Sequence, residues 1–148
     1  MISVDVENRS GIEVDDGAAV ELAGRVLRAE GIEAGELGIA FVAEEEMRTL
    51  KRRHLGIDES TDVLSFPIDG REEVPEGVPR ALGDVVLCPQ VVGAEWRWPL
   101  THGVLHLLGY EHGDEMEARE EALLTLGVRS TEPTGSAGGG FAGAGAEH

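Results

Sequence analysis

Three histidines lie close together in the stretch HGVLHLLGYEH and have a spacing that suits a metal ion. His102 and His106 are four residues apart, so on a helix both imidazoles project from one face, a turn apart. Gly109 follows, and glycine readily takes the left-handed conformation that ends a helix. The chain can then turn back and bring His112 to the same point. The spacing therefore predicts a metal site at a helix C-terminus.

Three imidazoles suit zinc and leave its fourth tetrahedral position open, as in catalytic zinc sites. The expected cofactor is one Zn²⁺ per chain, with a zinc-bound water as the reactive group. Nickel, cobalt or copper would also accept three histidines. The alternative is that the histidines are ordinary surface or hydrogen-bonded core residues. Zinc proteases with a similar pattern carry a glutamate base directly after the first histidine, and here that residue is Gly103.

The elements that must hold these histidines follow from hydrophobic periodicity and from glycine and proline positions. Strands are expected at 2–7, 36–43, 62–68 and 82–89, and helices at 14–30, 44–56, 90–98, 99–108 and 115–126. This order predicts an α+β fold, with a small mixed four-stranded sheet packed against about four to five helices. The metal site would lie at the end of the helix that carries His102 and His106.

The length of 148 residues suits a single domain, and 41% of the residues are hydrophobic. We expect a metallohydrolase-like domain over residues 1–129. The Gly/Ala-rich segment 130–148 is expected to be disordered. No run of residues is apolar enough for a membrane helix, and the N-terminal residues lack the pattern of a signal peptide. One cysteine, Cys88, cannot form an intramolecular disulfide, and these features favour a cytoplasmic protein without a membrane partner.

The chain is strongly acidic, with 29 acidic residues against 12 basic ones and a net charge of −17. Such a field disfavours nucleic acid over most of the surface. The one dense basic run is KRRH at 51–54, which includes the chain's single lysine. Adaptation to high salt and a merely solubilising surface are both consistent with this charge.

Three motifs together resemble the YbeY family of bacterial endoribonucleases that mature ribosomal RNA. They are HGVLHLLGYEH (102–112), TDVLSFP (61–67) and LGDVVLCP (82–89), in the family's order. The resemblance covers the chain from residue 2 to about 127. It implies an α+β fold and one zinc ion held by His102, His106 and His112.

The resemblance also implies a function. A YbeY-like protein would be a zinc-dependent endoribonuclease that cleaves single-stranded RNA. It would act in late maturation of the 3′ end of 16S rRNA and in ribosome quality control. The expected partners are ribosomal RNA in the small ribosomal subunit, and ribosome-associated proteins. The sequence does not fix the oligomeric state.

The chain departs from the family pattern at three places. Glu111 replaces the usual aspartate and keeps the charge. Leu55 stands where many members carry an arginine that is thought to act at the site. The segment between residues 89 and 102 is shorter than in most members, which would leave one wall of the site open.

Other candidate residues come from the same motifs. Arg52 and Arg53 would stabilise the negative charge of a phosphodiester transition state, or they are solvated residues at a helix end. Asp62, Asp84 and Ser65 are candidates to support the metal ligands, where a carboxylate would hydrogen-bond a histidine and fix its tautomer. Each aspartate could equally cap a turn or a strand. Glu111 would act as a proton shuttle or remain a solvated acid.

Three functions therefore compete. The first is a zinc endoribonuclease acting on rRNA. The second is a zinc hydrolase of another bond, such as a peptide, which Gly103 disfavours. The third is a non-enzymatic ribosome-associated factor with a structural metal. Activity that is lost on chelation and restored by zinc would separate the first from the third.

Overall fold

The computed structural model describes residues 2–59, 61–69, 74–111 and 113–126. The elements, in chain order, are β1 (Ile2–Asn8), α1 (Asp16–Ala29), β2 (Gly35–Phe41), α2 (Glu44–Leu55), β3 (Val63–Pro67), β4 (Ala81–Leu87), α3 (Pro89–Val92), the 3₁₀ helix η1 (Gly93–Glu95), α4 (Arg97–Leu107) and α5 (Asp114–Leu126). The predicted tail at 130–148 lies outside the described residues.

The four strands form one mixed sheet in the order β1-β2-β4-β3. β1, β2 and β4 are parallel, and β3 is antiparallel to β4 at one edge. The two parallel pairings require crossovers, which α1 supplies between β1 and β2, and α2 with β3 between β2 and β4. The predicted α+β fold with a mixed four-stranded sheet is confirmed.

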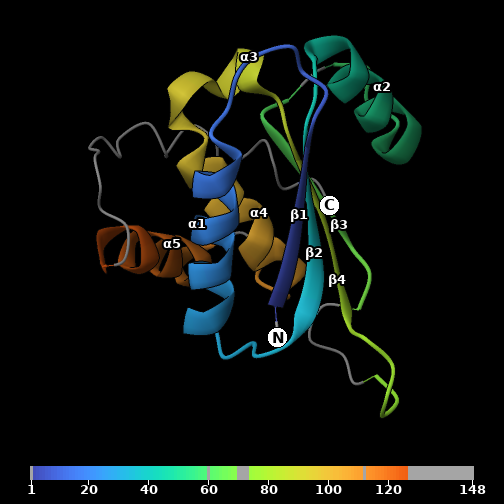
Figure 1. Cartoon of the computed structure of the whole chain (residues 1–148). Helices are drawn as coiled ribbons and strands as arrows, with labels where there is room; N and C mark the ends of the chain where they lie inside the picture. The colour runs from blue at the N-terminus through green and yellow to red at the C-terminus, as the bar shows by residue number, and fades with distance from the viewer. Residues whose placement is uncertain (1, 60, 70–73, 112, 127–148) are drawn as a thin grey trace.

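Helices cover both faces of the sheet (Figure 1). α1 and α4 pack on one face, where the main hydrophobic core includes Leu27, Phe41, Leu87 and Leu105, all fully buried. α2 lies on the other face over a smaller core, in which Met47 packs near Leu64 and Val86. α5 contacts α4 on the side away from the sheet.

One predicted element is wrong in detail. The sequence predicts a single short helix over 90–98, but the structure divides this segment among α3, η1 and the first residues of α4. Gly93 has φ 61° and ψ −139°, which no helix contains, so the helical course is interrupted there. Trp96 then packs edge-on against Phe41, with ring centroids 6.2 Å apart, and this anchors the start of α4.

Candidate metal centre

Helix α4 carries the first two predicted ligands and approaches the sheet very closely at Gly103. A β-carbon built there would lie 2.6 Å from Cγ1 of Val85 and 3.1 Å from Oγ of Ser65, distances that real side chains avoid. The Ser65 hydroxyl also donates a hydrogen bond of 3.0 Å to the Gly103 carbonyl oxygen. Gly103 therefore faces the sheet, and a glutamate base of the protease type cannot occupy this position without displacing α4.

The structure brings His102 and His106 together as predicted. Their ring centroids are 4.8 Å apart and the rings are nearly perpendicular, at 84°. His102 is 3% exposed, and the Nε2 atoms of both rings are shielded from solvent. His112 lies outside the described residues, so the three-histidine site remains a prediction for its third member.

A carboxylate from the last helix holds His102. The Nδ1 atom of His102 lies 2.5 Å from Oε2 of Glu120 in α5, and both side chains are at most 4% exposed. A carboxylate accepts hydrogen bonds, so a neutral imidazole in this contact would donate from Nδ1 and have its lone pair on Nε2. The sequence motifs predict this kind of contact for Asp62 or Asp84 and do not indicate Glu120.

The sequence does contain a signal for Glu120. Residues 116, 120 and 123 follow the spacing of one helical stripe, and Met116 and Leu123 are buried together with Glu120. An acidic residue in the apolar stripe of a helix is unusual because a buried charge requires a partner.

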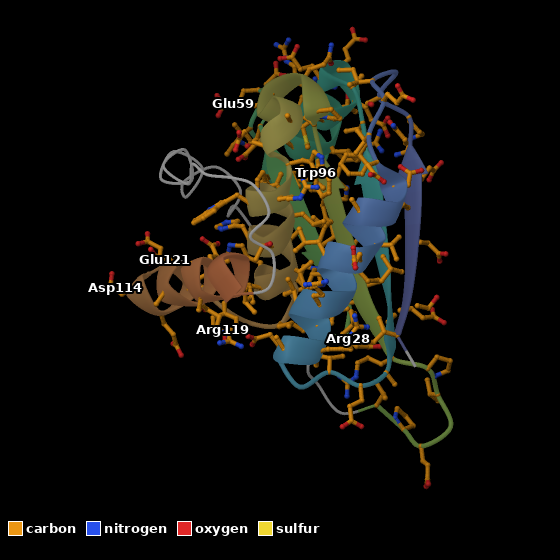
Figure 2. All side chains as sticks on the ribbon, turned by 60° about the vertical axis from the view of Figure 1, so that its left-hand side comes forward. Arg28, Glu59, Trp96, Asp114, Arg119 and Glu121 are labelled. Carbon is orange, nitrogen blue, oxygen red and sulfur yellow. The ribbon has the colours of Figure 1, made fainter. Side chains whose placement is uncertain are left out.

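A second set of contacts fixes α5 and the turn that follows α4. The Glu30 carboxylate, at the end of α1, accepts a 2.9 Å hydrogen bond from the Tyr110 hydroxyl and pairs with Arg119. Arg119 also donates to the carbonyl oxygen of Ala29 at 3.2 Å. Figure 2 shows Arg119 between α5 and the end of α1. These contacts join Tyr110, which follows the end of α4, and the middle of α5 to the same carboxylate at the end of α1.

Asp62 and Ser65 lie on the histidine side of the sheet, on or just before β3. Oδ1 of Asp62 accepts hydrogen bonds from the Val63 amide at 2.9 Å and the Thr61 hydroxyl at 3.2 Å, so this carboxylate caps the start of β3. Its Oδ2 atom is buried and has no hydrogen-bond partner among the described residues. Burial raises the pKa of the Asp62 carboxyl, and its hydrogen bonds act against that rise.

The structure does not bring Asp84 to the histidines. Asp84 precedes Val86 by two residues on β4, and side chains two apart on a strand share a face. Val86 belongs to the core under α2, so Asp84 lies on the face opposite α4, where its carboxylate covers Gly38. Glu111 is exposed beside the segment that the structure does not describe.

The predicted basic residues belong to α2. Arg52 is 3.2 Å from Oδ1 of Asp58, and Arg48 pairs with the same carboxylate at 2.8 Å. The hydrogen bond from Arg48 is the main reason that the pKa of Asp58 is lowered. Arg53 is exposed, and Leu55, at the position of the family arginine, packs against the small core under α2. The structure therefore places Arg52 and Arg53 on the helix that covers the other face of the sheet.

The donor set fits a metal such as zinc. Two imidazoles lie on adjacent turns of a buried helix, and one of them has its Nδ1 atom paired with a carboxylate, the arrangement in which Nε2 coordinates metal. A third imidazole follows after a glycine with φ 102°, Gly109, which ends the helix. His102, His106 and His112 are thus the residues that would hold the ion.

The chain thus belongs to a class of small α+β proteins in which a helix packed on a mixed sheet carries two neighbouring histidines. Comparison with known proteins then identifies the family. A model of the family described as Endoribonuclease YbeY matches residues 5–125 of the chain. The chain belongs to this family, as its three sequence motifs predict, and the predicted enzyme class agrees with the family's description.

Individual relatives agree with this assignment. The protein named Endoribonuclease YbeY from Acidothermus cellulolyticus is 40% identical over 138 residues, covering 80% of this chain and 84% of that protein. The protein of the same name from Mycolicibacterium gilvum is 37% identical over 136 residues, covering 80% of this chain and 76% of that protein. The solution structure of TM1509 from Thermotoga maritima has a TM-score of 0.51 at 20% identity and covers 90% of this chain, which shows the shared fold.

Proposed function

We propose that the chain is a zinc-dependent endoribonuclease that cleaves single-stranded RNA during maturation and quality control of the small ribosomal subunit. Late processing of the 3′ end of 16S rRNA is the proposed reaction, with ribosomal RNA and ribosome-associated proteins as partners, in the cytoplasm. The observation that carries the proposal is the His102–His106 pair, in which the Nε2 atoms of both rings are shielded from solvent and Nδ1 of His102 lies against Glu120. Membership of the YbeY family supplies the reaction class.

The zinc ion and the side chains would have separate roles in the reaction. A bound Zn²⁺ would polarise a phosphoryl oxygen and make water more acidic. His102, His106 and His112 would hold that ion, and the Glu120 carboxylate lies against Nδ1 of His102. Gly103 lets α4 lie close to the sheet, and the sheet occupies the space that the glutamate base of a zinc protease would need. The absence of this glutamate argues against a peptide as the substrate.

Two residues at the start of α4 are suited to bind RNA beside the histidines. Trp98 precedes His102 by one helical turn and is only half-buried, so its ring is available to stack on an unpaired base. The guanidinium of Arg97 lies 4.6 Å from the ring centre of Trp96, which places a cation at the same end of the helix. These residues supply local positive charge and an aromatic surface on an acidic molecule.

The proposal is tested by zinc content and by cleavage of a single-stranded RNA. We expect about one zinc per chain in the purified protein, and RNA cleavage that stops on chelation and returns with added zinc. His106→Ala should lose both the metal and the activity while the circular dichroism spectrum stays unchanged. Zinc binding without RNA cleavage would indicate a structural metal, and cleavage of casein but not RNA would indicate a protease.

A further inference from the structure

We propose that Glu120 is a positioning residue for His102, fixing the tautomer and ring orientation that this ligand needs to bind the metal. The inference rests on the proposed function, since it concerns the same metal site. It adds a residue from α5, outside the three motifs, to the residues on which the site depends.

The contact between the two side chains is short and protected from water. Oε2 of Glu120 is 2.5 Å from Nδ1 of His102, and the side chains are 4% and 3% exposed. Among the described residues, His102 is the one hydrogen-bond partner of Glu120. A carboxylate removed from water is costly without such a partner, so its place in the buried stripe of α5 is explained by this contact.

The contact has a direct chemical consequence. Either ring nitrogen of a neutral histidine can hold the proton, and the hydrogen bond of one nitrogen decides which nitrogen is left to bind metal. An acceptor at Nδ1 keeps the proton there, so the lone pair of His102 is on Nε2. The neighbouring Arg119, paired with Glu30 at the end of α1, fixes the part of α5 that carries Glu120.

The test compares three variants in the full chain. Glu120→Leu removes the acceptor but keeps a side chain of similar size between Met116 and Leu123, and Glu120→Gln keeps a carbonyl acceptor without the charge. Glu121→Gln is the matched control, because Glu121 lies on the same helix and is exposed (Figure 2). Thermal unfolding of the metal-free proteins reports whether each variant folds.

Two measurements are made on each variant. The first is the zinc dissociation constant, from competition with a chromophoric chelator. The second is the tautomer of His102 in the metal-free protein, from the ¹⁵N chemical shifts of its ring. We expect Glu120→Leu to weaken zinc binding by about 10- to 100-fold and to remove the preference for Nδ1–H. Glu120→Gln should be intermediate and Glu121→Gln unchanged, whatever the order of their thermal stabilities.

The outcomes separate this inference from the proposed function. Zinc affinity and a His102 tautomer that are both unchanged in Glu120→Leu would overturn the positioning role while leaving the zinc site intact. If the wild-type chain binds no zinc, the proposed function fails, and the tautomer in the metal-free protein still decides whether Glu120 orients His102. If Glu120→Leu does not fold, the comparison of Glu120→Gln with Glu121→Gln carries the test.

Discussion

At Gly103 a missing side chain determines how close α4 comes to the sheet. Val85 and Val63 from neighbouring strands, and the Ser65 hydroxyl between them, surround the position that a β-carbon would take. The distance between α4 and the sheet in turn sets where His102 and His106 stand. The glycine beside His102 thus has a packing role that the histidine spacing alone does not reveal.

Gly103→Ala should therefore destabilise the fold by about 1–3 kcal/mol, because the new methyl group overpacks a rigid contact with Val85. Gly24→Ala in α1 is the control. A methyl group there meets only the end of the flexible Arg28 side chain, at 3.2 Å, and alanine is the better helix former by about 1 kcal/mol. Urea unfolding of both variants measures the difference, and equal stabilities would contradict the close approach at Gly103.

Asp62 should make the free energy of unfolding depend on pH. Burial raises the pKa of this carboxyl in the folded state, so between the unfolded and folded pKa values the folded chain holds a proton that the unfolded chain has lost. The contribution of Asp62 to the free energy of unfolding is therefore greatest at low pH and falls as pH rises above about 4.

Asp62→Asn keeps an oxygen acceptor for the Val63 amide and removes the charge. The stability of this variant relative to wild type should increase with pH over the same interval, measured by urea unfolding of the metal-free proteins. A difference that does not change with pH would show that Asp62 has no raised pKa.

Trp98 should contribute to the binding of RNA and not to the binding of zinc. Loss of one stacked base costs about 1–3 kcal/mol, so Trp98→Ala is expected to raise KM for single-stranded RNA about tenfold or more while kcat changes little. Trp96→Phe, at a buried neighbour, is the control for folding effects. Unchanged KM in Trp98→Ala would exclude this ring from the RNA site.

At the scale of elements, α5 has two attachments to the rest of the chain. Glu120 contacts α4, and Arg119 contacts the end of α1 through Glu30. Tyr110 shares the Glu30 carboxylate, so the turn after α4 is tied to the same point. Because the Glu30 carboxylate is buried, each of its hydrogen bonds is stronger, and the loss of one lowers the free energy of unfolding more than at an exposed site.

Tyr110→Phe should cost about 0.5–1.5 kcal/mol, because the 2.9 Å hydrogen bond from its hydroxyl to the Glu30 carboxylate is removed while the aromatic ring is kept. Glu30→Gln should cost more, since it also weakens the ion pair with Arg119. Hydrogen exchange of amides in α5 is the local measurement, and faster exchange is expected there before any change in the central strands. Uniform exchange changes would contradict a local role for this network.

The elements themselves were largely predictable. The four strands and the helices α1, α2, α4 and α5 follow from alternation, helical stripes and glycine stops, and their ends differ from the expected ones by at most two residues. The segment before α4 was not predicted correctly, because the backbone angles of Gly93 interrupt a helix that the composition favours. The helical stripe indicates that Glu120 is buried, but its contact with His102 was not predictable, since that depends on how two helices pack and not on local sequence.

At the scale of the whole molecule, the net charge of −17 is the dominant feature. Among the described residues no helix is both long and apolar enough to cross a bilayer. Repulsion among exposed carboxylates opposes the folded state, and salt screens it, with a Debye length of about 3 Å at 1 M.

We expect the thermal midpoint of unfolding to rise as salt increases from low concentration to the molar range. The same salt should weaken RNA binding, because phosphate contacts are lost by competition with counterions. A thermal midpoint that does not respond to salt would argue against adaptation of this chain to high salt, and sodium chloride and potassium chloride titrations give the comparison.

The placement of Glu120 has a consequence for how the protein is made. Ribosomes synthesise chains from the amino end, and structure forms as each segment emerges. The helix that orients His102 is the last element of the described fold, so a partly made chain holds the histidines of α4 without the carboxylate that aligns them. His102 therefore has no carboxylate at Nδ1 until α5 has been synthesised and has packed against α4.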